Sequence, residues 1–181
     1  DELYSSDVTT LYSMPDHHIP TGLTMDNDTR RMVLEWAYKS DNRYIIEDSY
    51  DSFYQYGDKR LAPLFSMDTM GRVIYLCSFA RILSSAIRVS FIVLPDSLVR
   101  RWSKTHRFYR CLASRLEQAI ILEFISRGYL HKQIVTMKEI YKAKRDFLTD
   151  RLMHSALANN IKIINADAGT HFLINYRSAC T

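Results

Sequence analysis

The 181-residue chain has no apolar run long enough to span a membrane, and no charged-then-apolar secretory leader at its start. Glycine and proline are scarce, with five and four residues, and no repeat or low-complexity segment appears. These absences exclude a collagen-like or low-complexity chain, and no membrane partner is expected. The remaining composition, 47% apolar and 24% charged, is typical of a soluble domain that buries one core.

Cysteine is also scarce. Cys77, Cys111 and Cys180 are odd in number and lack CxxC spacing, which predicts free thiols in a reducing cytoplasm rather than a disulfide framework. The adjacent pair His17 and His18 suits neither the helical nor the strand spacing of a metal site. We therefore predict a cytoplasmic protein without a metal.

Short apolar runs alternate with longer amphipathic segments, which is the crossover pattern of an α/β fold with a mainly parallel sheet and flanking helices. The expected strands are 9–14, 44–47, 73–76, 89–94, 161–164 and 171–176, and the expected helices are 28–39, 96–127 with a break near its middle, and 129–158. Gly128 ends the helix before it.

Polar residues follow two of these strands. Asp48 and Tyr50 come after one strand, and Ser78 to Arg81 come after the next, so both groups are expected at the carboxyl ends of buried strands. Open α/β sheets bind their ligands there. A pyridoxal-phosphate site needs a ring carboxylate, a ring hydroxyl, phosphate donors and a lysine that holds the aldehyde. The sequence offers all of these except the lysine.

Six segments, in order, resemble the aminotransferase-like domain of the MocR/GabR-type regulators, bacterial transcription factors that join a GntR-type winged helix to a fold-type-I aminotransferase module. YSMPDHHIPTG at 12–22 is similar to the family's TPSHQFPTG, and RYIIEDSYDS at 43–52 to its RYIIEDDYDSEF. The other similar segments are RVIYLCSFAR at 72–81, IRVSFIVLP at 87–95, 117–130 and 137–148.

The resemblance implies pyridoxal phosphate as the cofactor and gives each pocket residue a role. Asp48 would face the pyridine nitrogen, Tyr50 the ring hydroxyl, and Ser78 and Arg88 the phosphate. Arg81 occupies the position of the family's Schiff-base lysine. A guanidinium stays protonated and cannot condense with an aldehyde, so the coenzyme is not expected as an internal aldimine. No catalytic residue is assigned, and the chain is not predicted to be an enzyme.

Three further departures surround the same pocket. Ala80 replaces a small polar residue, Ser84 to Ala86 replace a proline-containing turn, and Ser49 replaces the second Asp of EDDYD. Together with Arg81 they favour a degenerate site over a working site that lost only its lysine.

The resemblance also divides the chain. Residues 1–128 would be part of the large domain, 129–158 a long connecting helix, and 159–181 the beginning of a small α+β domain. By comparison with the family, the winged helix, the first part of the large domain and most of the small domain lie outside this sequence. We therefore expect a half-pocket, open sheet edges covered by homo-oligomerisation, and DNA contact only through a winged helix absent from this chain.

Three functions fit these observations. The first is an effector-sensing and dimerisation domain of a MocR/GabR-like regulator that binds a small-molecule effector. The second is an inactive interaction scaffold. The third is a pyridoxal-phosphate-dependent aminotransferase or coenzyme-binding regulator whose lysine was replaced.

Overall fold

The computed structural model describes residues 2–57, 61–106 and 109–177, so Cys180 lies outside the described residues. Along the chain the elements are α1 (Glu2–Ser5), β1 (Thr10–Ser13), α2 (Asn27–Tyr38), β2 (Tyr44–Asp48), α3 (Leu64–Met67), β3 (Val73–Ser78), β4 (Ser90–Val93), α4 (Asp96–Thr105), α5 (Arg115–Ser126), α6 (Tyr129–Met153), a 3-10 turn (Ala158–Asn160), β5 (Ile161–Ile164) and β6 (Leu173–Tyr176). Cys77 and Cys111 are both free thiols.

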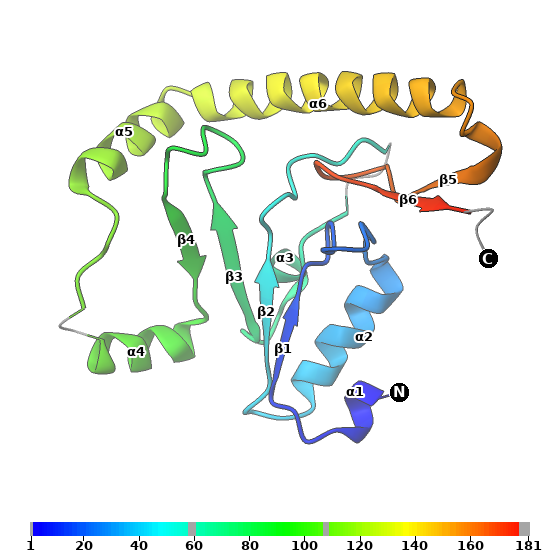
Figure 1. Ribbon diagram of the computed structural model, residues 1–181. Coiled ribbons are helices and arrows are strands. Elements are labelled where there is room, and N and C mark those ends of the chain that lie inside the picture. The colour runs from blue at the N-terminus through cyan, green and yellow to red at the C-terminus, as the bar shows by residue number, and fades with distance from the viewer. Residues whose placement is uncertain (1, 58–60, 107–108, 178–181) are drawn as a thin grey trace.

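The main sheet has the strand order β1-β2-β3-β4 (Figure 1). The first three strands are parallel, and β4 runs antiparallel to β3 with Ser90 opposite Ser78. A separate antiparallel pair, β5 and β6, follows the long helix α6. The predicted α/β class with a mainly parallel sheet is therefore confirmed.

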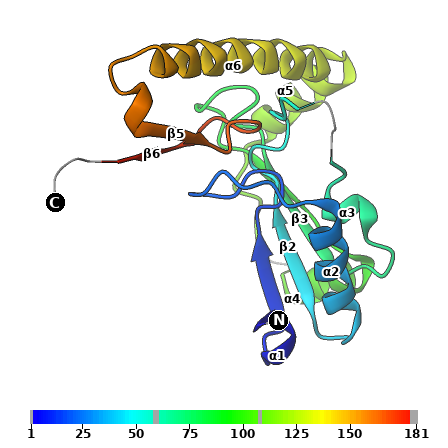
Figure 2. The ribbon, with the colours of Figure 1, turned by 90° about the vertical axis from the view of Figure 1, so that its right-hand side faces the viewer.

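The core lies between the sheet and α2, which covers one of its faces (Figure 2). Asp26 caps this helix by accepting a 2.7 Å hydrogen bond from the Thr29 amide, and the apolar side of the helix then points at the strands. Trp36 and Ala37 are fully buried against Ile45 of β2. Burial of these apolar side chains stabilises the packing of α2 on the sheet.

The opposite face of the sheet is only partly covered. Ile46, Ile74, Leu76 and Ile92 line a hollow of about 340 Å³, and Trp102 of α4 lines its side. Ile92 is 47% exposed and Trp102 50% exposed. This face therefore presents apolar surface to solvent over the middle of the sheet.

The long helices match the sequence prediction except at their ends. The expected break between 96 and 127 separates α4 from α5, where Ser114 and Glu117 form a capping box. Helix α6 ends at Met153, five residues before the predicted end at 158. The reason is Ser155, whose hydroxyl donates to the Leu152 carbonyl at 2.8 Å and accepts from the Leu157 amide at 3.2 Å, in competition with the helical pattern.

None of the helices within the described residues combines the length and the apolar composition needed to cross a membrane. In Figure 1, α6 lies across the top of the molecule, past the carboxyl ends of β1, β2 and β3. Charged residues are distributed along the whole length of this helix.

A buried carboxylate lies at the end of β2. Glu47 has no exposed surface, and its two oxygens accept from the amides of Leu64 at 2.9 Å and Phe65 at 2.7 Å. Burial, reinforced by the nearby Asp16 carboxylate, raises the pKa of Glu47 to about 7. The two amide bonds and Arg30 act in the opposite direction.

This shift predicts a pH-dependent stability. Because the folded-state pKa lies above the ordinary value of 4.5, the contribution of Glu47 is complete below pH 4.5 and is lost as the pH rises through about 7. The loss amounts to about 3 kcal/mol in the free energy of unfolding. We expect Glu47→Gln to flatten the fall between these limits, as measured by urea unfolding at a series of pH values.

The matched control is Glu35→Gln, which removes a solvent-exposed carboxylate of α2. This variant should keep the wild-type pH profile. An identical slope for Glu47→Gln and wild type would contradict the assignment.

Candidate functional site

The predicted pocket residues gather at one edge of the sheet. Asp48 ends β2 and Ser78 ends β3, which are parallel neighbours, so both lie at the same edge. Arg88 reaches this edge from the other direction, because β4 is antiparallel and begins opposite the end of β3. Phe79 extends that pairing by donating from its amide to the Val89 carbonyl at 3.0 Å.

Asp48 already has a partner in this arrangement. The Tyr12 hydroxyl on β1 donates a short hydrogen bond to its carboxylate. That bond, together with partial burial and the charge of Asp48, raises the pKa of Tyr12 to about 12. The carboxylate that the resemblance assigns to the pyridine nitrogen is therefore engaged by a phenol of the same chain.

Tyr50 is engaged as well. Its hydroxyl donates to the His17 carbonyl at 2.8 Å. Burial is the main cause that raises the pKa of Tyr50 above its usual range, and the neighbouring Asp51 adds to it. The Arg81 guanidinium acts in the opposite direction, with its carbon 5.9 Å from the centre of the Tyr50 ring.

Arg81, at the expected lysine position, points toward the carboxyl-terminal part of the chain. Its guanidinium donates to the Thr170 hydroxyl at 3.2 Å, and its carbonyl accepts from the Tyr54 hydroxyl at 2.7 Å. Thr170 in turn donates to the Asp51 carboxylate from its amide at 2.8 Å and from its hydroxyl at 3.1 Å. Arg81 is thus an exposed contact to the turn before β6.

Ser78 and Arg88 are the least engaged of the five. The Ser78 hydroxyl accepts a local bond from the Ala80 amide at 3.3 Å. Arg88 is exposed, and within the described residues it makes no hydrogen bond or ion pair. Both remain available to an anionic group such as a phosphate. Their role in binding one stays a prediction.

The structure gives a physical reason for Ser49, which stands where the family motif has an Asp. Ser49 is buried, and its hydroxyl donates to the Asp16 carboxylate at 3.2 Å. In the family motifs that this chain resembles, TPSHQFPTG has Ser at the position of Asp16, and EDDYD has Asp at the position of Ser49. At these two positions the chain thus has Asp and Ser where the motifs have Ser and Asp, and its own two residues are hydrogen-bonded.

The turn at 167–171, which the sequence pattern did not place at this edge, packs against the site. The Tyr56 amide donates to the Asp167 carbonyl at 2.8 Å, and the Gly169 amide donates to the Tyr54 carbonyl at 2.7 Å. Gly169 has a φ of +71°, and a Cβ there would lie 2.1 Å from the His17 ring. Only glycine allows this approach. Burial, with His171 adding to it, lowers the pKa of His17 to about 4.

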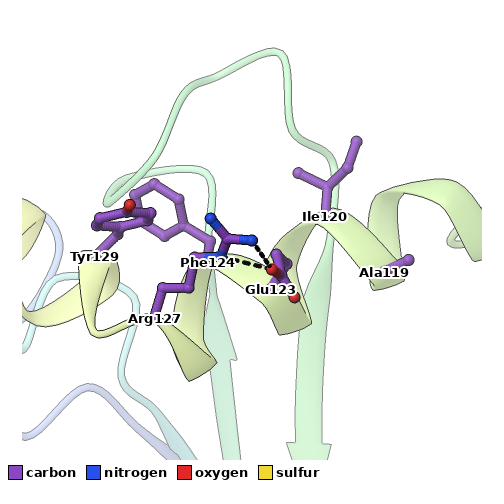
Figure 3. Close-up of a pocket in the computed structure, with 6 residues that line it drawn as sticks. All are labelled: Ala119, Ile120, Glu123, Phe124, Arg127 and Tyr129. Carbon is purple, nitrogen blue, oxygen red and sulfur yellow. Dashed lines mark hydrogen bonds and ion pairs between the residues drawn. The ribbon is translucent and has the colours of Figure 1, made fainter.

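A second hollow, of about 420 Å³, lies where α5 meets α6 (Figure 3). Ile120, Phe124 and Tyr129 line it, and its charged residues Glu123 and Arg127 form an ion pair with each other. An exposed ion pair of this kind one helical turn apart is typical of a solvated helix. The hollow offers no arrangement of reactive groups.

Residues 17–179 match the family described as aminotransferase class I and II. The chain belongs to this family. The uncharacterized HTH-type transcriptional regulator YhdI of Bacillus subtilis is 32% identical over 174 residues, which cover 96% of this chain and 37% of YhdI. The probable rhizopine catabolism regulatory protein MocR of Rhizobium meliloti is 30% identical over 169 residues, 93% of this chain and 34% of MocR.

The predicted resemblance to MocR-type regulators is thereby confirmed, although the chain spans only about a third of the length of these relatives. Among solved structures, the kynurenine aminotransferase of Pyrococcus horikoshii, in complex with PMP, superposes with a TM-score of 0.77 at 27% identity. The match covers 93% of this chain and 42% of that one.

The residues at this edge do not fit a covalently held pyridoxal phosphate. A guanidinium stands at the lysine position and cannot form a Schiff base. The ring-facing groups Asp48 and Tyr50 are hydrogen-bonded to Tyr12 and to the His17 carbonyl. Ser78 and Arg88, on the side that the resemblance assigns to the phosphate, keep uncommitted donors.

Proposed function

We propose that this chain is the aminotransferase-like sensing and dimerisation domain of a MocR-type transcriptional regulator, with a pocket that forms no Schiff base. The observation that carries the proposal is the position of Arg81, which lies over the Tyr50 ring and donates to Thr170. DNA would be bound by a winged helix outside this chain. A small-molecule effector would bind at the same sheet edge without covalent chemistry.

The charges at the edge indicate what such an effector carries. Arg81 and Arg88 are both exposed there, and Ser78 adds a hydroxyl. Two guanidinium groups favour an anionic group, which they can hold with charge-assisted hydrogen bonds. We expect an effector with a phosphate or carboxylate.

A second function is favoured by a specific observation. Asp48, Tyr50, Ser78 and Arg88 all lie at the edge where the resemblance requires them. A coenzyme-dependent enzyme or regulator that lost only its lysine would leave this pattern. Restoring the lysine separates the two functions.

The first experiment mixes the wild-type chain with pyridoxal phosphate, with and without an amino acid. Because no amine is available at position 81, we expect the visible spectrum of the free aldehyde and no pyridoxamine phosphate. Amino-acid-dependent formation of pyridoxamine phosphate by wild type would contradict the proposal.

The lysine variant Arg81→Lys is then reduced with borohydride, and the labelled residue is mapped by mass spectrometry. The control is Arg88→Lys, which places an exposed lysine at the same edge and reports nonspecific labelling. Labelling of position 81 well above the control, weakened by Asp48→Ala on the same background, would favour the second function. Equal labelling of both variants supports the proposed one.

Dimerisation has its own prediction. Burial of the apolar face around Ile92 would contribute roughly 25 cal/mol per Å², against a net charge of only +4. Light scattering across a dilution series should show a dimer or larger species at micromolar concentration. We expect Ile92→Lys to shift the equilibrium between this assembly and the monomer toward the monomer.

Met32→Lys is the control, because Met32 of α2 is 52% exposed and lies on the solvent side of the covering helix. It should leave the association unchanged. A clean wild-type monomer at high concentration would rule out self-association by this face.

A further inference from the structure

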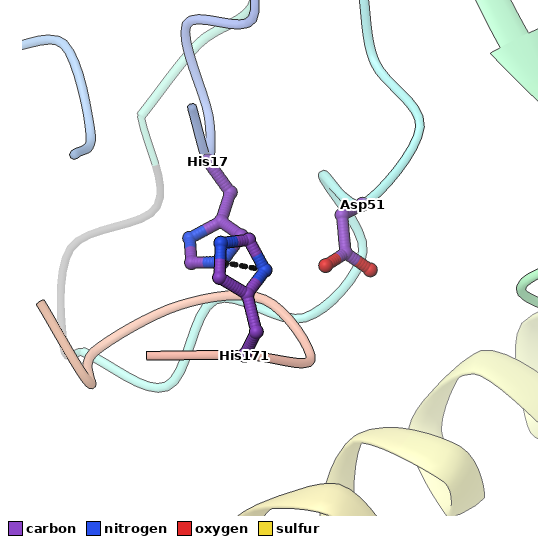
Figure 4. A group of neighbouring side chains, drawn as sticks. All are labelled: His17, Asp51 and His171. Atoms are coloured by element: carbon purple, nitrogen blue, oxygen red, sulfur yellow. Dashed lines mark hydrogen bonds between the residues drawn. The ribbon is translucent and has the colours of Figure 1, made fainter. Parts of the chain in front are cut away.

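Three titratable side chains from distant parts of the chain meet beside the site. His17 follows β1, Asp51 follows β2, and His171 lies in the turn before β6. Figure 4 shows the two imidazole rings against each other, with the Asp51 carboxylate directed toward them. The histidine next to His17 in sequence is not involved, since His18 contacts Thr21 instead.

The distances suit a shared ion. His17 Nε2 lies 3.0 Å from His171 Nδ1. One potential ligand atom from each of the three residues lies within 4.8 Å of the other two. With Zn–N bonds of about 2.0–2.1 Å, two nitrogens on a tetrahedral ion lie roughly 3.3 Å apart. The two nitrogens would therefore have to move apart by only a few tenths of an ångström to bind the same ion.

The cluster also contains polar atoms without partners. Among the described residues, Asp51 Oδ1 is buried and makes no hydrogen bond, and the same holds for His17 Nδ1 and His171 Nε2, the ring nitrogens outside the 3.0 Å contact. An ion between His17 Nε2 and His171 Nδ1 would satisfy the Asp51 oxygen and not these two nitrogens. His17 is 1% exposed and Asp51 2% exposed. Buried polar atoms of this kind cost free energy unless something satisfies them. Both hydrogen bonds from Thr170 go to Oδ2 of Asp51, so Oδ1 accepts none of them.

A histidine pair that only shares one proton accounts for part of this geometry. One neutral ring donates to the other across the 3.0 Å contact. It leaves Oδ1 of the buried Asp51 carboxylate without a donor. A cation accepts lone pairs from all three groups at once.

We propose that His17, Asp51 and His171 bind one divalent zinc-class cation. Two imidazoles and one carboxylate are ligands that Zn²⁺ accepts, and with three protein ligands the fourth position is open to water. The ion joins the loops after β1 and β2 to the turn before β6. It would add to the hydrogen bonds by which the chain already holds this turn on the carboxyl edge of the sheet, independently of whether the edge binds an effector.

The test is titration of the metal-free chain with Zn²⁺, followed by calorimetry, and with Co²⁺, followed by its visible absorption. We expect one equivalent to bind, and Co²⁺ to give the spectrum of a four-coordinate site. Zn²⁺ should raise the Tm, and EDTA should reverse the rise. His171→Ala should weaken binding by at least roughly tenfold and abolish the Tm shift.

Two control variants separate this site from surface histidines. His18→Ala removes the exposed neighbour of His17, and His154→Ala removes the exposed histidine paired with Asp150 on α6. Both should keep wild-type affinity. Asp51→Asn tests the third ligand if loss of a histidine disturbs folding. Absence of micromolar binding by wild type, or wild-type affinity in His171→Ala, would overturn the proposal.

Discussion

The buried ion pair between Arg30 and Asp16 is the interaction on which the site depends. Arg30 has no exposed surface, and its guanidinium donates at 2.9 Å to Asp16 and to the carbonyls of Pro15, Met25 and Ala62. A charge so deeply buried must be fully paired, and removing one partner of such a pair costs about 3–5 kcal/mol. The bonds fix the loop after β1 to the start of α2 and to the segment before α3. The loop that carries His17 is therefore held rigidly against the sheet.

This rigidity determines what the carboxyl edge does. Asp16 also accepts from Ser49, so the loop after β2 is positioned by the same carboxylate. Both loops contact the turn before β6. The Thr170 amide donates to Asp51 of one loop, and the His171 ring contacts His17 of the other. Asp48 and Tyr50, which the resemblance assigns to the coenzyme, are hydrogen-bonded here to Tyr12 and to the His17 carbonyl. This internal use of polar groups supports the proposed sensing role, as does the contact of Arg81 with Thr170.

The sequence could predict the parts of this arrangement that depend on local patterns. The order and approximate positions of the strands, the break before α5, and the placement of Asp48 and Ser78 at one edge all follow from apolar periodicity and from the geometry of parallel strands. Contacts between residues far apart could not be predicted. His17 meets His171 across 154 positions, and the exchange of Asp16 with Ser49 is visible only once both are seen in contact. The early end of α6 depended on one serine hydroxyl.

The central claim is that the turn at 167–171 is fixed on the sheet edge by hydrogen bonds from the chain itself. Hydrogen exchange of the Gly169 and Thr170 amides tests it most directly, because these amides donate to the Tyr54 carbonyl and to the Asp51 carboxylate. The account predicts slow exchange for both, comparable with the β2 amide of Ile45, which donates to Arg72. Exchange of both amides at the rate of an unstructured peptide would contradict it.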